Sequence, residues 1–287
     1  MKKLITQKTA VVIALGSLFA FSSALSAKAV NDDVVKKQRA ALEANTDGKG
    51  FGPQSPRDLN GVPGTNFRAF GMQPSSNNLN LCNIHFHKNA EHRGGEFTTY
   101  AGNGDGKGNN TGFVYNGKLT SAQLAPVSGQ ICAGKGESLK SGDTLEVHFV
   151  YSSAQVAPGP TLGACLTENT MNPGLRVEGQ VIVLANDENA MDFNKLAMVG
   201  ERNGYHQALN IPRNMGTPIT YIGSTTGPGF NEAGSPLQVS WSVRPQVAVV
   251  DINTVGQWCE DNVFNEDHAH GVRNLVTNPK LLSPMSR

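Results

Sequence analysis

Two stretches of the chain alternate polar and apolar residues with the period of a β-strand, in which successive side chains point to opposite faces. In the first stretch, NLCNIHFH, the alternation places Asn83, His85 and His87 on one face. It also predicts that Leu81 lies on that face and Cys82 on the opposite one. The polar chemistry of this strand is therefore expected on a single side.

The second alternating stretch, TLEVHFVY, has the same character. Thr144, Glu146 and His148 fall on one face, and the other face is apolar or aromatic. On these patterns and on shorter apolar runs, strands are expected at residues 80–87, 144–151, 179–184, 219–222, 237–243 and 247–250.

Apolar residues at helical spacing predict a helix over residues 32–44, and shorter helices are expected over 192–198 and 252–259. The 32 glycines and 15 prolines indicate many turns between short strands. We predict a mostly β (α+β) fold. It would be a single domain built on a central, largely antiparallel twisted β-sheet with short peripheral helices and long loops.

Residues 48–78 are rich in Gly, Pro, Asn and Ser and are expected to run irregularly over the surface. The predicted organisation is an N-terminal helix and irregular surface segment, residues 30–78, packed on a catalytic domain of residues 79–287. Residues 1–29 have the positive start, apolar run and small-residue end of a secretory signal peptide. The protein is therefore expected to be periplasmic or secreted, with no membrane span in the mature chain.

The cysteines form no CxxC pair, and in an exported chain an even number favours disulfides. Two disulfides are expected, and all three pairings stay open among Cys82, Cys132, Cys165 and Cys259. The formal net charge of +1, with Lys and Arg scattered along the chain, gives no electrostatic footprint for nucleic acid or an anionic membrane. The expected partner is a small molecule, and the sequence makes no prediction of oligomeric state.

His85, His87 and His148 are the candidate metal ligands. Two histidines separated by one residue on a strand lie on the same side, close enough to share one ion. If the strand of His148 lies beside theirs, three imidazoles converge and leave one coordination position for water, as in catalytic zinc sites. Asn83 and Glu146, each two residues before a histidine, are the candidate orienting partners. The expected metal is Zn²⁺, and Co²⁺ or Cd²⁺ would suit the same ligands.

The segment HFHKNAEH (residues 85–92), followed by LEVHFVY (145–151), resembles the metal-binding core of alpha-type carbonic anhydrases. The resemblance extends to GPQSP (52–56), TYIGSTTGP (220–228) and LQVSWSVRPQVAVVDINTVGQW (237–258). The long glycine-rich insertions between these motifs are closer to the delta class of carbonic anhydrases.

This resemblance implies a zinc enzyme that converts carbon dioxide and water to bicarbonate and a proton. It assigns the metal ligands and their orienting partners to His85, His87, His148, Asn83 and Glu146. Thr226, with Thr225 as the alternative in the Ser-Thr-Thr run, matches the threonine whose hydroxyl accepts from zinc hydroxide. Glu91 matches the carboxylate that receives the threonine's own hydrogen.

The resemblance provides no match for the proton-shuttle histidine of the family, and Tyr151 stands where many members have a further histidine. His206 is the candidate substitute, with His268 and His270 as alternatives.

Two other interpretations use the same residues. The pattern His85-x-His87-x-x-x-Glu91 is also found in cupins, where Glu91 would bind iron or manganese directly. The turn expected before the later cupin histidine is missing from SGDTLEVH. The second alternative is a non-catalytic secreted metal-binding protein, which would have no use for a pair such as Thr226 and Glu91.

Overall fold

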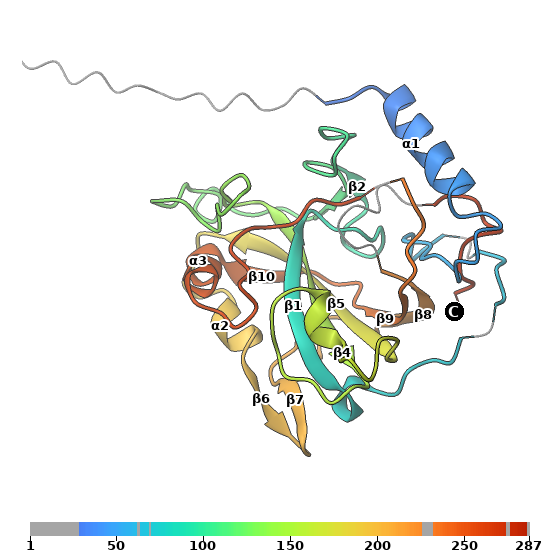
Figure 1. Cartoon of the computed structure of the whole chain (residues 1–287). Helices are drawn as coiled ribbons and strands as arrows, with labels where there is room; N and C mark the ends of the chain where they lie inside the picture. The colour runs from blue at the N-terminus through green and yellow to red at the C-terminus, as the bar shows by residue number, and fades with distance from the viewer. Residues whose placement is uncertain (1–28, 62–63, 69, 226–231, 274–275, 286–287) are drawn as a thin grey trace, which may run out of the picture.

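A computed structural model describes residues 29–61, 64–68, 70–225, 232–273 and 276–285. Its centre is a six-stranded sheet with the order β1-β4-β5-β9-β8, in which β10 also pairs with β5 (Figure 1). The strands of this sheet are β1 (Asn80–Lys88), β4 (Thr144–Ser152), β5 (Leu175–Ala185), β8 (Ile219–Ser224), β9 (Gln238–Val243) and β10 (Ala248–Asp251). All six lie where the sequence predicted strands, so the mostly β prediction is confirmed.

The sheet is mixed. The pairs β1–β4, β4–β5 and β8–β9 are antiparallel, whereas β9 and β10 both run parallel to β5. Because β4 occupies one edge of β5, β9 pairs with the first half of the other edge and β10 with the second half. The Gln180 side chain donates to the carbonyl of Gln246, in the kink between β9 and β10, at 3.0 Å.

Outside this sheet, the described residues form three α-helices and two 3₁₀ turns. They are α1 (Asp32–Ala44), α2 (Phe193–Leu196), α3 (Ile252–Glu260), η1 (Ser76–Asn78) and η2 (Leu162–Cys165). Two small antiparallel pairs add β2 (Thr99–Tyr100) with β3 (Phe113–Val114), and β6 (Val199–Arg202) with β7 (Tyr205–Ala208). The β6–β7 hairpin was not predicted, although its turn, Asn203-Gly204, has positive φ at both residues, the typical signal of a tight hairpin.

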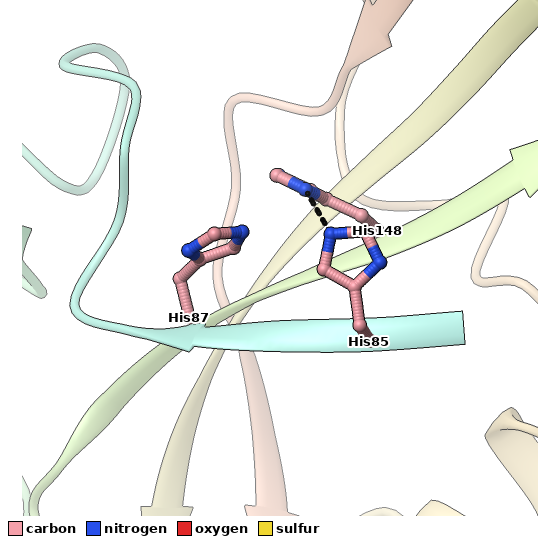
Figure 2. Close-up of side chains that lie close together, drawn as sticks. All are labelled: His85, His87 and His148. Atoms are coloured by element: carbon pink, nitrogen blue, oxygen red, sulfur yellow. Dashed lines mark hydrogen bonds between the residues drawn. The ribbon is translucent and has the colours of Figure 1, made fainter. Parts of the chain in front are cut away.

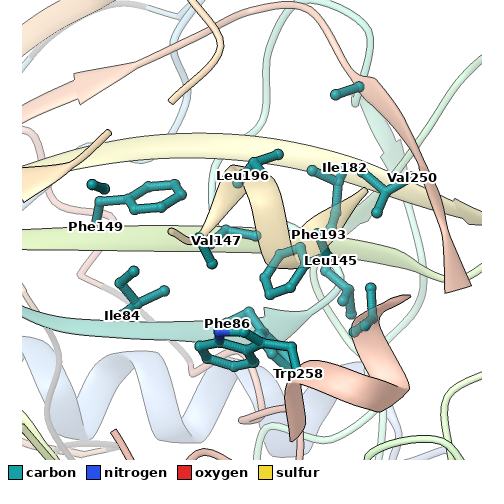
Figure 3. Packing of buried hydrophobic residues seen from close by; sticks show 14 of the residues in the cluster. Ile84, Phe86, Leu145, Val147, Phe149, Ile182, Phe193, Leu196, Val250 and Trp258 are labelled. Atoms are coloured by element: carbon teal, nitrogen blue, oxygen red, sulfur yellow. The ribbon is translucent and has the colours of Figure 1, made fainter. Parts of the chain in front are cut away.

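Apolar side chains cover both faces of the central sheet. On one face, Phe86, Val147 and Phe149 belong to one buried cluster with Phe193 of α2 and Trp258 of α3, and Phe86 contacts both of these rings (Figure 3). A second cluster on the other face includes residues of β4, β5 and β9, among them Val150, Val177 and Trp241. All nine residues of β4 are consequently buried, and its polar side chains must find partners inside the protein.

The predicted faces of β1 are wrong at its first residues. A register shift between Leu81 and Asn83 marks a β-bulge, which places an extra residue in one strand of the pair. As a result Leu81 joins the same cluster as Ile84 and Phe86, while Cys82 joins the opposite cluster. The alternation that the sequence predicts holds only from Asn83 onward.

The structure decides the cysteine pairing that the sequence left open. Cys82 bonds Cys165, which joins β1 to η2, and Cys132 bonds Cys259 of α3. Closing loops of 83 and 127 residues stabilises a fold by roughly 4–5 kcal/mol each on chain-entropy grounds. Two disulfides are typical of proteins from an oxidising compartment.

Within the described residues, no helix has the length and apolar character needed to cross a membrane. The expected signal peptide, residues 1–29, lies outside the described residues except for Ala29. The expectation that residues 48–78 run over the surface is not met at Gln54, Ser55 and Arg57, which are buried. Their polar side chains bond residues of the domain interior, a role that the sequence pattern did not indicate.

Candidate metal centre

Three imidazoles from two adjacent strands face one another. His85 of β1 stands directly opposite His148 of β4 in the antiparallel pair, and His87 follows two residues later on the same face. The ring centroids of His85, His87 and His148 are 4.9–5.3 Å apart, and one nitrogen of each ring lies within 4.8 Å of the other two (Figure 2). The convergence predicted from the alternation is confirmed.

The outward-facing nitrogen of each ring has an acceptor. Asn83 Oδ1 lies 2.6 Å from His85 Nδ1, and the Asn83 amide nitrogen donates to the Gly159 carbonyl, which fixes the orientation of the amide. Glu146 Oε1 lies 3.0 Å from His148 Nε2, and the Gly271 carbonyl lies 3.1 Å from His87 Nδ1. These acceptors place N–H on the outer nitrogens and leave a lone pair on Nε2 of His85, Nε2 of His87 and Nδ1 of His148.

Two of these lone pairs meet at close range. His85 Nε2 and His148 Nδ1 are 3.2 Å apart, as the dashed line in Figure 2 shows. Burial, together with the neighbouring imidazoles, holds the pKa of His85 well below its usual range, so a shared proton is disfavoured. Two nitrogens bound tetrahedrally at about 2.0–2.1 Å from a zinc ion lie about 3.3 Å apart. The spacing and the donor type therefore fit a single zinc ion.

Glu146 connects the imidazoles to the backbone that follows β1. Its Oε2 accepts from the backbone N–H groups of Glu91 and His92 at 2.7 and 3.0 Å. Its Oε1 also lies 2.6 Å from Nδ1 of His92, whose Nε2 lies 2.6 Å from the Tyr221 hydroxyl. His92, Glu146 and His148 also lie close enough to suit a metal, but their facing atoms are already joined by hydrogen bonds. His92 is thus a buried structural residue.

Glu91 forms a buried ion pair with Arg57, at 2.6 Å. Burial by itself would raise the pKa of Glu91, but the Arg57 charge and the nearby imidazoles outweigh it and lower the pKa to about 2. The guanidinium of Arg57 lies 5.1 Å from the Trp241 ring centroid. Arg57 was not predicted from the sequence, where its one signal is its position next to the GPQSP motif.

A family model described as delta carbonic anhydrase matches residues 76–254, more than half of the chain. The chain belongs to the delta carbonic anhydrase family. The matched segment contains all three convergent histidines, Glu91 and Glu146. No curated protein matches the chain at a significant level.

Solved structures similar to this chain include carbonic anhydrases, among them alpha-carbonic anhydrases. One, from Thermovibrio ammonificans in complex with sulfanilamide, is 14% identical, with 75% of this chain and 86% of that chain covered and a TM-score of 0.25. The Photobacterium profundum enzyme is 15% identical, with 86% and 97% covered and a TM-score of 0.26. A halotolerant carbonic anhydrase from Dunaliella salina is 16% identical, with 81% and 89% covered and a TM-score of 0.30. At these identities and TM-scores, the likeness adds nothing to the family assignment.

The cupin interpretation is wrong for this delta carbonic anhydrase. Besides the family match, the position of Glu91 argues against it. Glu91 Oε1 lies 3.7 Å from Nδ1 of His87 and Oε2 lies 4.0 Å from Nε2 of His148, which are the outward nitrogens of those rings. Glu91 thus lies outside the ring of convergent nitrogens and binds Arg57.

The remaining predicted site residues lie in different places. Thr226 falls outside the described residues, and Thr225 is buried just after β8, with its N–H donating to Leu237 O at 3.3 Å. His206 lies on β7, and its backbone N–H bonds Asn80 at the far end of β1. Within the described residues, the His206 ring lies 4.0 Å from Glu201 and contacts none of the three histidines.

His270 instead lies beside the three convergent histidines. Its ring centroid is 5.8 Å from those of His85 and His87, and its backbone pairs with the free edge of β1. Its Nε2 bonds Glu266 Oε1 at 2.9 Å, and 39% of the side chain is exposed. The ring centroid of His268 lies 5.3 Å from that of His270.

Proposed function

We propose that this protein is a zinc-dependent carbonic anhydrase that catalyses the reversible hydration of carbon dioxide to bicarbonate and a proton. The observation that carries the proposal is the convergence of three neutral imidazole nitrogens whose outward N–H groups are all held by acceptors. Three neutral ligands leave the charge of the ion intact, and the fourth position stays open for water, as catalytic zinc requires.

His85 and His87 would hold the ion through Nε2, and His148 through Nδ1. Bound zinc would supply the nucleophile by lowering the pKa of its water to about 7, the value known for carbonic anhydrases. Asn83, Glu146 and the Gly271 carbonyl keep each ring in the required tautomer and orientation.

Glu91 is the proposed acceptor for the hydroxyl hydrogen of Thr226, so that the threonine oxygen can itself accept a hydrogen bond from the nucleophile. Arg57 supports this role because its charge holds the Glu91 carboxyl ionised, and an ionised carboxylate can only accept. Arg57 is therefore a positioning residue that acts through Glu91.

His270 is the proposed proton carrier, in place of His206. Its ring lies beside His85 and His87 on one side and reaches solvent on the other, and Glu266 holds it in place. His206 has no contact of this kind among the described residues. We also propose export, with residues 1–29 as the signal peptide, because both disulfides need an oxidising compartment.

The test is stopped-flow hydration of carbon dioxide by the purified chain from residue 30 onward, with metal content measured on the same samples. We expect about one zinc per chain, loss of turnover after chelation and recovery with added Zn²⁺. Zinc binding without metal-dependent turnover would instead favour the non-catalytic metal-binding protein. Absence of bound zinc under conditions where the protein is folded would contradict both.

A further inference from the structure

A second polar pocket lies on the face of the sheet opposite the three histidines. Tyr151 and Arg176 are direct partners across β4 and β5, as are Phe149 and Glu178, so these side chains share the face away from His148. The pocket has a volume of about 310 Å³. Segments 75–77 and 207–213 complete its walls.

The charge of this pocket is strongly one-sided. Its charged lining residues are Arg176, Glu178, Arg202, Arg213 and Arg244. Four guanidinium groups against one carboxylate leave a formal excess of three positive charges. The whole chain has a formal net charge of only +1, so the excess is a property of this pocket and not of the protein surface in general.

Two of the arginines form a buried floor and share the single carboxylate. Arg176 Nε donates to Glu178 Oε1 at 2.7 Å, and Arg244 Nη1 donates to Glu178 Oε2 at 3.2 Å. The Arg176 and Arg244 side chains are only 13% and 10% exposed. One carboxylate cannot neutralise two buried guanidiniums, so one positive charge remains uncompensated on the floor.

The floor also has unused hydrogen-bond donors. A guanidinium has five N–H donors. Among the described residues, the one further contact of the Arg176 and Arg244 guanidiniums, besides the Glu178 bonds, is a long one of 3.5 Å from Arg176 to the Gln73 carbonyl. In the described part of the chain, no nitrogen of Arg176 or Arg244 is both sealed from solvent and unpaired. Both residues line the pocket, so their solvent-accessible N–H groups are available to a ligand there.

Arg202 and Arg213 stand at the rim. Arg202 ends β6 and Arg213 lies in the segment that follows the hairpin, and both are exposed. Neither forms an ion pair with any described residue. Unpaired arginines around a concave site raise the local concentration of anions.

We propose that this pocket binds a small oxyanion with two negative charges, of the phosphate type, either free or as the terminal group of a small molecule. The planar guanidinium matches phosphate oxygens in pairs, which is why arginine is common in phosphate sites. Two negative charges complement the excess on the lining, and the volume suits a small ligand. The site lies outside the proposed catalytic centre and does not require zinc.

The test is titration calorimetry of the protein with inorganic phosphate, at constant ionic strength set with chloride. We expect saturable binding at one site per chain, with the same affinity in zinc-loaded and chelated protein. Loss of binding on chelation would place the anion at the metal and overturn the proposal, as would absence of saturable binding. The hydration assay tests the catalytic proposal separately.

Variants locate the site. The double substitution Arg202→Gln/Arg213→Gln should weaken phosphate binding at least about tenfold, because two charge-assisted contacts are lost. Lys36→Gln/Arg39→Gln, the same loss of two positive charges at exposed positions of α1, should alter the affinity less than twofold. Equal weakening by both would show a non-specific charge effect and overturn the proposal.

Glu178→Gln gives an effect in the opposite direction. Removing the internal counter-charge should strengthen phosphate binding by about tenfold, whereas a purely structural role for this carboxylate would weaken it or leave it unchanged. Sulfate should compete with phosphate. A phosphomonoester such as glycerol phosphate shows whether the natural ligand is the free ion or the terminal phosphate of a small molecule. Affinity for the ester equal to or above that for phosphate indicates a terminal group, and failure of the ester to bind indicates the free ion.

Discussion

The two faces of β4 border regions of opposite formal charge. On one face, His148 lies beside Glu146 and Glu91, and Glu91 pairs with Arg57, so these three charged residues leave a formal excess of one negative charge that favours a cation. On the other face, Tyr151 borders the arginine pocket, where the excess is three positive charges. Since side chains alternate along a strand, residues three positions apart can serve ligands of opposite sign.

The two faces of β4 also differ in what their side chains contribute to the protein. Leu145, Val147 and Phe149 fill the apolar core against α2 and α3, whereas Glu146 and His148 belong to a hydrogen-bonded network. A residue of the apolar core stabilises the fold by burial, whereas a residue of the hydrogen-bonded network holds other polar side chains in position. Substitutions on the two faces should therefore separate stability from metal binding.

The largest effect is expected for His148→Ala. Loss of one of three zinc ligands should reduce metal affinity and turnover at least about a thousandfold, beyond the roughly 10–100-fold cost of losing an orienting partner. Metal analysis and stopped-flow hydration measure both quantities, with circular dichroism to confirm folding. Retention of zinc and turnover in a folded variant would contradict the assignment of the ligands.

Phe149→Ala tests the other face one residue away. Phe149 is fully buried, and truncating such a side chain costs about 3–5 kcal/mol of unfolding free energy. Turnover per bound zinc should stay within about twofold of the parent protein. Urea unfolding and active-site titration give the two numbers, and a large loss of turnover per zinc would show that the faces are not independent.

Glu91→Gln tests the buried ion pair. Burial alone would raise the Glu91 pKa, but Arg57 brings it to about 2 from the ordinary 4.5, which corresponds to about 3 kcal/mol of stability. A depressed carboxyl pKa stabilises the fold above pH 4.5 and loses this contribution as the pH falls toward 2. The difference between metal-free parent and variant in urea unfolding should therefore be largest at pH 5–7 and shrink below pH 4.

The control for Glu91→Gln is Asp58→Asn, which breaks the exposed Arg93–Asp58 pair. An exposed pair contributes about 0–1 kcal/mol, so this variant should change stability little at any pH. A stability loss in Glu91→Gln that is the same at pH 3 and pH 7 would contradict the assigned pKa.

Asn83→Ala should weaken zinc binding about 10–100-fold, since His85 loses the acceptor that holds its tautomer. Asn80→Ala is the matched control on the same strand, because its amide bonds Ala154 O and the His206 N–H and not a ligand. Competition with a chelator of known affinity measures the change. Equal effects of the two substitutions would show that Asn83 does not orient His85 for zinc binding.

The smallest effect is expected for His270→Ala. Turnover in weak buffer should fall roughly tenfold and recover when imidazole buffer is added, because a solution base replaces the missing proton carrier. His206→Ala should leave turnover unchanged both in weak buffer and in imidazole buffer. The opposite result would return the shuttle role to His206 and exclude His270.

Local patterns were sufficient to place the candidate metal ligands on the correct faces of their strands. His85 and His87 share a face because the period of a strand is two, and Glu146 and His148 share a face for the same reason. Asn83 and Glu146 could be predicted as orienting partners because each is two residues from its histidine. The predicted faces failed at Leu81 and Cys82, since a bulge changes the register without a clear sequence signal.

The sequence by itself determined the strands of the central sheet and the faces on which His85, His87 and His148 lie with Asn83 and Glu146, because the face of a strand follows from spacings of two residues. Only the tertiary structure decided that Gly271 orients His87, since a backbone carbonyl 184 residues away has no side-chain signature. It also decided that Arg57 neutralises Glu91 and that four arginines scattered over residues 176–244 line one pocket. Charge along the chain is a sum over residues, whereas the field at a site depends on which distant residues the fold brings within a few ångströms.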